Sequence, residues 1–66
     1  MIGYRIIELL TNNKKIFSIH EIAKKLNEDE LKILIAINSL QELDIIRMTV
    51  CCLSLTNDCS CYYSMN

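Results

Sequence analysis

The residues of this chain best suited to chemistry are its cysteines, which all lie in the last sixteen residues. A thiol can bind a metal ion, form a disulfide or fill a small apolar position in a strand. The spacing C-C-x6-C-x-C does not match a ferredoxin-type ligand run, and a tetrahedral zinc site would require two adjacent cysteines to converge. Free thiols, a disulfide and a metal site therefore all stay open for Cys51, Cys52, Cys59 and Cys61.

The sequence from 45 to 65 predicts a two-stranded β-hairpin, because β-branched and alternating residues surround a turn signal. If Asn57 and Asp58 form a two-residue turn, three of the four cysteines share one face of the hairpin and the fourth lies on the other. Cys52 and Cys61 would then be diagonal neighbours across the strands, which makes this pair the candidate disulfide.

No combination of residues in the chain predicts catalysis. His20 is the only histidine, and the sequence places no partner acid or nucleophile beside it. The single glycine, Gly3, excludes a glycine-rich phosphate loop. A chain of 66 residues also leaves little room for a pocket that excludes water. We therefore predict that the protein is not an enzyme.

Apolar residues at helical spacing predict three helices, near 2–12, 18–26 and 28–43. The second helix has the clearest start, because Ser18 and Glu21 have the spacing of a capping box. The residues expected in the core are Ile6, Leu10, Ile19, Ile22, Leu26, Leu34, Ile37, Leu40 and Ile46.

Turns after the first helix must form without glycine, because the only glycine lies at the start of the chain. Asn12 and Asn13 can end the first helix, since Asn tolerates the left-handed conformation. Asn27 is expected to end the second helix and, because it lies three residues before a Glu, also to begin the third. Asp44 is expected to leave that helix at the position where glycine is usual.

This order of elements resembles the winged helix-turn-helix pattern. A short helix is followed by a tight turn and a longer helix. The longer helix and the residues after it read Ile-x-x-Leu-x-x-x-Asp-Ile-Ile over 37–46, where the family usually has Leu-x-x-Leu-x-x-x-Gly-Leu-Ile. The resemblance covers nearly the whole chain. It implies one mainly α domain over 1–66 with a small β-hairpin as the wing, as in small MarR- or ArsR-like regulators.

The resemblance also implies that the third helix enters a DNA major groove. Asn can read adenine, an apolar side chain can contact a thymine methyl, and lysines elsewhere can hold phosphates. The candidate DNA-binding residues are Lys14, Lys15, Lys24, Lys25, Lys32, Ile35, Asn38 and Ser39.

Charge and exposed apolar residues favour an alternative. The net charge is −1, and Glu28 and Glu42 lie on the outward face of the third helix. That charge does not attract nucleic acid. Leu31 and Ile35 also face outward, so the helix could instead be covered by a second copy or by another protein. We keep both partners, DNA and protein, and expect a homodimer.

A cysteine-rich wing on so small a domain is also similar to the FeoC-like proteins of bacterial ferrous-iron transport. That similarity implies an iron–sulfur cluster on the four cysteines. An iron–sulfur cluster or a zinc ion is thus the alternative to a protein without a cofactor.

No apolar run approaches the roughly 20 residues that span a bilayer, and the first residues lack the layout of a signal peptide. We therefore expect a cytoplasmic protein without a membrane partner.

Overall fold

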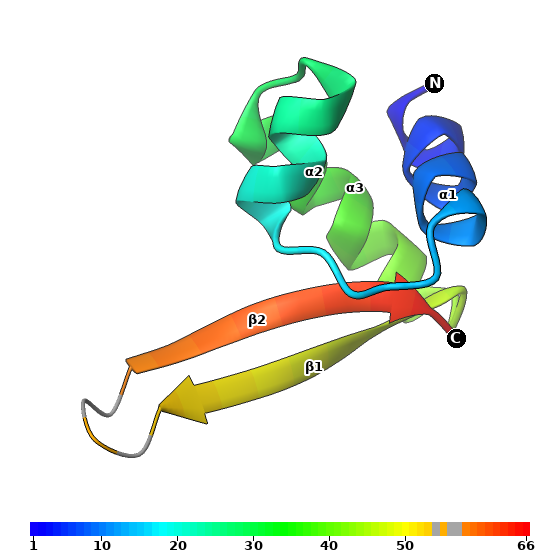
Figure 1. The fold of residues 1–66 in the computed structure, drawn as a ribbon. Helices are drawn as coiled ribbons and strands as arrows, with labels where there is room; N and C mark the ends of the chain where they lie inside the picture. Colours follow the sequence, from blue (N-terminus) through cyan, green and yellow to red (C-terminus); the bar gives the residue numbers. More distant parts are fainter. Residues whose placement is uncertain (54, 56–57) are drawn as a thin grey trace.

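The computed structural model describes residues 1–53, 55 and 58–66. Helices come first and an antiparallel hairpin follows (Figure 1). The predicted mainly helical fold with a small hairpin is therefore confirmed. The elements are α1 (Ile2–Asn12), α2 (Ile19–Leu26), α3 (Glu30–Glu42), β1 (Ile46–Leu53) and β2 (Asp58–Met65).

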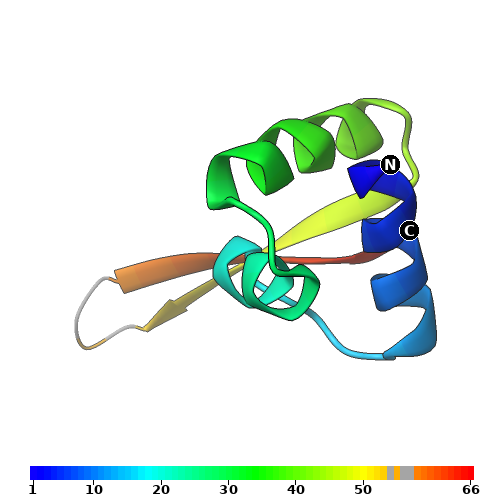
Figure 2. The same ribbon diagram turned by 90° about the horizontal axis from the view of Figure 1, so that it is seen from above.

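The three helices gather over one end of the hairpin, and the other end extends away from them (Figures 1 and 2). The core lies where the inward stripes of the helices meet the base of the hairpin. In the described part of the chain it consists of Ile6, Leu10, Phe17, Ile22, Ala23, Ile33, Ile37, Leu40, Ile46 and Tyr63.

Most of the expected core residues are buried, but α3 differs by one position. Ile33 is 0% exposed, whereas Leu34, which we expected in the core, is 38% exposed. Neighbouring residues on a helix point about 100° apart, so the two cannot both point at the centre of the core, and α3 is rotated so that Ile33 does. Ile19 and Leu26 are only partly buried and pack at the edge of the core.

The capping box predicted at the start of α2 is present. The Glu21 amide donates to Ser18 Oγ at 3.1 Å, and the Ser18 amide donates to Glu21 Oε1 at 3.1 Å. Phe17, just before the cap, pairs with Tyr63 of β2 through amide–carbonyl bonds of 3.0 and 2.7 Å. This bridge fixes the start of α2 against the base of the hairpin.

Left-handed residues end α2 and α3 without glycine. Asp44 has φ 61°, and the following amide, of Ile45, reaches back to Leu40 O at 3.0 Å. This arrangement closes the end of α3 as glycine usually does, so the expectation for Asp44 is confirmed. Asn27 has φ 54° and ends α2 in the same way.

The expected start of α3 was wrong. Asn27 does not cap α3, because its backbone is committed to the end of α2; Asp29 is the cap, and α3 begins two residues later than predicted, at Glu30. Asn13 ends α1 at the predicted place, but in an extended conformation rather than a left-handed one. Its side-chain amide and its backbone amide both donate to Leu9 O, at 2.9 and 3.2 Å, which satisfies that carbonyl directly.

The register of the hairpin also differs from the expected one. Asp58 lies within β2 opposite Leu53, so the predicted two-residue turn is wrong; Asn57 lies outside the described residues. Cys52 pairs directly with Cys59, and these two form the disulfide, with their Cα atoms 4.0 Å apart. The expected Cys52–Cys61 pairing is therefore wrong in this structure.

The change of register leaves the two faces of the hairpin as predicted. Cys52 faces Cys59 instead of Tyr63, a difference of four residues, and an even shift keeps every side chain on its original face. Cys61 therefore still shares a face with the disulfide, while Cys51, next to Cys52 on β1, lies on the other.

Among the described residues, no helix is long and apolar enough to cross a bilayer.

Candidate functional site

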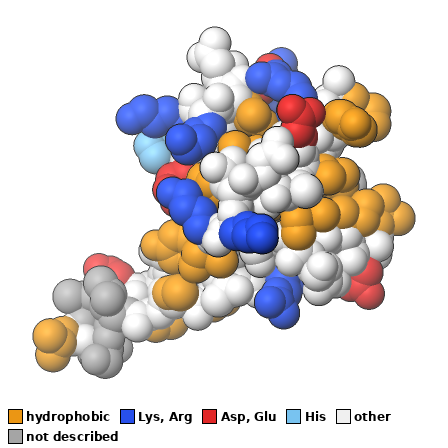
Figure 3. Space-filling view, turned by 45° about the vertical axis from the view of Figure 1, so that its right-hand side comes forward, with side chains coloured by type: hydrophobic (Ala, Val, Ile, Leu, Met, Phe, Trp, Pro, Cys, Tyr) orange, Lys and Arg blue, Asp and Glu red, His pale blue; other side chains and the backbone are white. Residues whose placement is uncertain are grey.

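Exposed cations from three segments line two adjoining hollows on the surface, and we call these residues the basic face. One hollow, of about 470 Å³, is lined by Lys14, Lys15 and Arg47 together with apolar side chains. The second, of about 580 Å³, is lined by Lys15, Lys24 and Lys25. Lys15 belongs to both hollows, so the basic face is continuous. Figure 3 shows Lys and Arg side chains spread over one side of the molecule, with apolar surface between them.

The fold places each of these cations by exposing the side of an element that does not enter the core. Lys24 and Lys25 follow the buried pair Ile22 and Ala23 on α2, and so lie on its outer side. Arg47 follows the buried Ile46 on β1 and alternates to the opposite face.

The segment between α1 and α2 is held close to the core and carries the other two cations. Lys15 Nζ lies 4.7 Å from the centre of the Phe17 ring, which restrains the ammonium group at the junction of the two hollows. The Lys15 amide also donates to Asn13 O at 2.7 Å, a tight local turn that presents Lys14 to solvent.

Glu21 is the acid that lines these hollows in the described part of the chain. Its pKa lies below the ordinary value, first because the Ser18 amide donates to the carboxylate and further because Lys15 and Lys25 lie nearby. The carboxylate therefore stays charged at neutral pH and offsets one of the five positive charges of the basic face.

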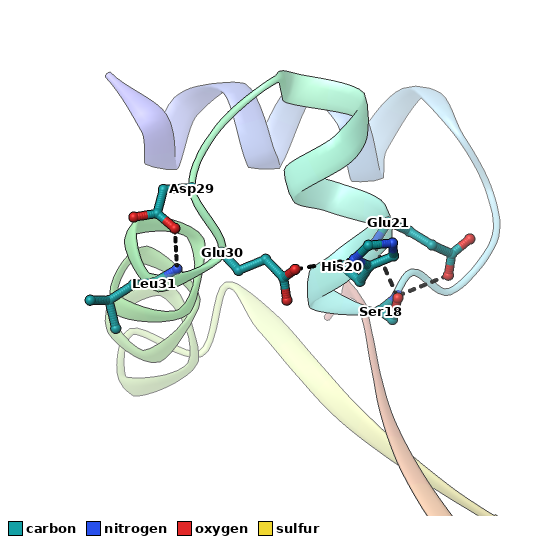
Figure 4. Close-up of polar contacts among 6 residues, drawn as sticks. All are labelled: Ser18, His20, Glu21, Asp29, Glu30 and Leu31. Carbon is teal, nitrogen blue, oxygen red and sulfur yellow. Dashed lines mark hydrogen bonds and ion pairs between the residues drawn. The ribbon is translucent and has the colours of Figure 1, made fainter.

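Two further polar side chains, His20 and Arg5, have partners within the protein. His20 Nδ1 lies 3.1 Å from Glu30 Oε2, which connects α2 to the first turn of α3 (Figure 4). Arg5 contacts Glu28 at 3.3 Å and donates to Leu26 O at 2.7 Å, which ties α1 to the end of α2.

The basic face, by contrast, makes no ion pair with any residue that the structure describes. Its charges are therefore available to an external anion.

The residues predicted to read bases are exposed on α3 but stand apart from the basic face. None of them lines either hollow in the described part of the chain. Seen from above, α3 lies on one side of the molecule, and α2 with the segment before it lies on the other (Figure 2). The residues concerned are Lys32, Ile35, Asn38 and Ser39.

The first turn of α3 is acidic and its outer side is apolar. Asp29 and Glu30 flank the start of the helix, and Asp29 Oδ1 accepts the Leu31 amide at 3.4 Å (Figure 4). Leu31 is 62% exposed and Ile35, one turn further along, is 61% exposed. Carboxylates repel phosphates, and contiguous exposed apolar residues are typical of a protein interface.

The cysteines form a disulfide and two exposed thiols, Cys51 and Cys61. Because Cys52 and Cys59 are bonded to each other, they are not thiolate ligands in this state. The described residues contain no group of three or more His, Cys, Asp or Glu side chains that could hold a metal.

The structure thus brings together Lys14, Lys15, Lys24 and Lys25 but not the four predicted residues of α3. Sequence reasoning missed Arg47. Its position beside the inward-facing Ile46 in an alternating strand was the signal that could have indicated an exposed cation. Comparison of the chain with protein-family models, with curated proteins and with solved structures gives no match.

Proposed function

We propose that the protein is a small DNA-binding regulator with a winged helix-turn-helix fold, which acts as a homodimer in the cytoplasm. The observation that supports this function is the basic face, five exposed cations around two hollows with no internal ion pairs among the described residues. Cations arranged in this way match the spaced phosphates of a nucleic-acid backbone. The order of α2, a left-handed turn, α3 and a hairpin agrees with the proposed fold.

In this proposal the two surfaces have different tasks. The basic face binds phosphates and supplies affinity without sequence information. The exposed polar residues of α3, Lys32, Asn38 and Ser39, with Ile35, contact the edges of bases. A homodimer supplies two half-sites, as helix-turn-helix proteins commonly require.

A gel-shift titration at two salt concentrations tests the phosphate-binding task. Five phosphate contacts per subunit predict a slope of about −4.5 for log K against log salt for each half-site, and about −9 for the homodimer, since each contact contributes about −0.9. Raising salt fourfold should therefore weaken binding by about 500-fold per half-site. Lys24→Ala combined with Lys25→Ala leaves three contacts per subunit, for which the same change in salt predicts about 40-fold per half-site.

The control keeps the charge and changes the shape. Lys24→Arg with Lys25→Arg should bind with the slope of the wild type, since both residues are exposed and neither makes an ion pair with a described residue. A slope that is the same for the alanine and arginine pairs would remove these two residues from the DNA interface. An absence of salt-dependent binding in the wild type would refute the proposed function.

A second candidate function is protein interaction through α3, with the disulfide-bonded hairpin as an appendage. The exposed Leu31 and Ile35 and the acidic first turn of the helix favour it. Light scattering of the wild type and of Ile35→Lys separates the two functions. If α3 is a protein interface, the mass of the wild type exceeds that of one chain and the substitution returns it to one chain, while the salt slope on DNA stays unchanged. If α3 contacts DNA, the substitution leaves the mass unchanged and alters DNA binding.

A further inference from the structure

A free thiol lies one residue pair away from the disulfide, on the same face of the hairpin. Cys52 is paired with Cys59, and the next pair on that face is Val50 with Cys61. Cys61 is exposed and unbonded. The three sulfur-bearing residues Cys52, Cys59 and Cys61 therefore form one cluster across both strands.

The separation of these residues allows a second pairing. Diagonal neighbours in an antiparallel pair have Cα atoms about 7–8 Å apart, and a disulfide accepts up to about 6.8 Å. Cys61 must therefore approach Cys52 by only about 1 Å to form a bond of normal geometry. Cys51 also carries an exposed thiol but lies on the opposite face, where the pleat separates it from the disulfide.

We propose that Cys61 exchanges with Cys59 as the disulfide partner of Cys52. In this step the Cys61 thiolate attacks Cys52 Sγ, the bond between Cys52 and Cys59 breaks, and Cys59 leaves as a thiolate. Cys61 loses a proton to solvent and Cys59 takes one up. One disulfide and one thiol are present before and after, so the step needs no oxidant or reductant. Attack on Cys59 Sγ is disfavoured because it would join residues two apart on one strand.

The base of the hairpin confines the exchange to the distal part. The Phe17–Tyr63 bridge fixes β2 two residues beyond Cys61, and the fully buried Ile46 fixes the start of β1. A diagonal bond between Cys52 and Cys61 keeps the register of the base and needs only a local approach of the two strands. Placing the two residues directly opposite each other would instead need a slip of two residues, which keeps all side chains on their faces. Because Met48 stays opposite Tyr63, such a slip would leave two extra residues in β1, as a bulge between Met48 and Cys52.

The surroundings of the cysteines permit this movement. The distal part of the hairpin extends beyond the helices in both ribbon views (Figures 1 and 2), so the strands can approach each other there away from the helices. The exchange gives the wing two covalently distinct shapes. We expect the two shapes to contact DNA differently, and this expectation rests on the proposed function. The exchange itself does not depend on DNA binding.

Thiol trapping tests the exchange without DNA. The oxidised protein is held at pH 8 without added thiol or oxygen, then quenched with excess N-ethylmaleimide, cleaved with chymotrypsin and sequenced by mass spectrometry. Cleavage after Leu55 separates Cys52 from the peptide that carries Cys59 and Cys61, and fragmentation shows which of those two is labelled. We expect a Cys59-labelled population besides the Cys61-labelled one, with Cys52 and Cys61 in the bonded peptide pair.

Matched serine variants decide the mechanism. Cys61→Ser should abolish labelling of Cys59, and Cys51→Ser should leave it unchanged, because only Cys61 shares the face of the disulfide. The labelled fraction should also be independent of protein concentration, as an intramolecular step requires. Three results would overturn the proposal: no labelling of Cys59 in the wild type, labelling of Cys59 that persists in Cys61→Ser, or labelling of Cys59 that is lost in Cys51→Ser. Cys61→Ser should keep the salt slope on DNA, so failure of the exchange and failure of DNA binding remain distinguishable.

Discussion

The position of α3 against the core can be tested by two neighbouring substitutions, Ile33→Ala and Leu34→Ala. Ile33 is fully buried and its truncation leaves a cavity, which costs about 2–5 kcal/mol. Leu34 is 38% exposed, so truncation loses only part of the transfer free energy of a leucine, about 1 kcal/mol, and water fills the space. A chain of 66 residues has a total stability of about 3–10 kcal/mol, so the first loss is a large fraction of the whole.

Urea denaturation followed by circular dichroism of the helices measures both losses. The midpoint for Ile33→Ala should fall well below that for Leu34→Ala, with the same dependence of the free energy of unfolding on urea. If Ile33→Ala is too unstable to show a folded baseline, Ile33→Val should still cost about 0.5–1.5 kcal/mol. A larger loss for Leu34→Ala than for Ile33→Ala would mean that α3 is rotated by one residue and that the described core is incorrect.

Three further predictions concern charge, covalent linkage and backbone conformation. Because the folded pKa of Glu21 lies below its ordinary value of 4.5, the stability from its charge is complete above that value and is lost as pH falls through the folded pKa. The difference in urea midpoint between the wild type and Glu21→Gln should therefore shrink between pH 6 and pH 3, and a constant difference would contradict this cause. Reducing the disulfide, which joins residues seven apart, should lower the free energy of unfolding by about 2.5 kcal/mol. A Cys52→Ser variant should be insensitive to dithiothreitol, and equal sensitivity would place the stabilising bond elsewhere. Asp44→Ala should cost about 1 kcal/mol because φ is 61°, whereas Asp44→Gly should cost nothing, and equal losses in chemical denaturation would argue against a left-handed residue.

Features that depend on neighbouring residues could be predicted from the sequence. The capping box of Ser18 and Glu21 needs only a spacing of three residues, and the structure forms it as predicted. Asp44 could be assigned to the end of α3 because the apolar pattern stops there and only a few residue types adopt the required conformation. Local signals were ambiguous only where two ends meet, at Asn27, which can either end one helix or begin the next.

Features that depend on contacts between distant segments could not be predicted. The sequence offered no glycine turn to set the register of the hairpin, so the partner of Cys52 was decided only by the anchored base, where Phe17 pairs with Tyr63. Arg47 likewise lines the same hollow as Lys14 and Lys15 only because β1 lies close to the segment between α1 and α2.

Periodicity alone therefore determined which residues form helices and strands, because backbone hydrogen bonding and the alternation of side chains act over a few residues. It also determined that three of the cysteines share one face of the hairpin, since that statement survives any even shift of register. Tertiary packing decided how α3 is rotated and which cysteines bond. It also placed the basic face around two hollows that the predicted base-reading residues of α3 do not line in the described part of the chain. The alternative rotations of α3 and the alternative cysteine pairings have nearly the same local structure. Only contacts between distant segments give these alternatives different free energies.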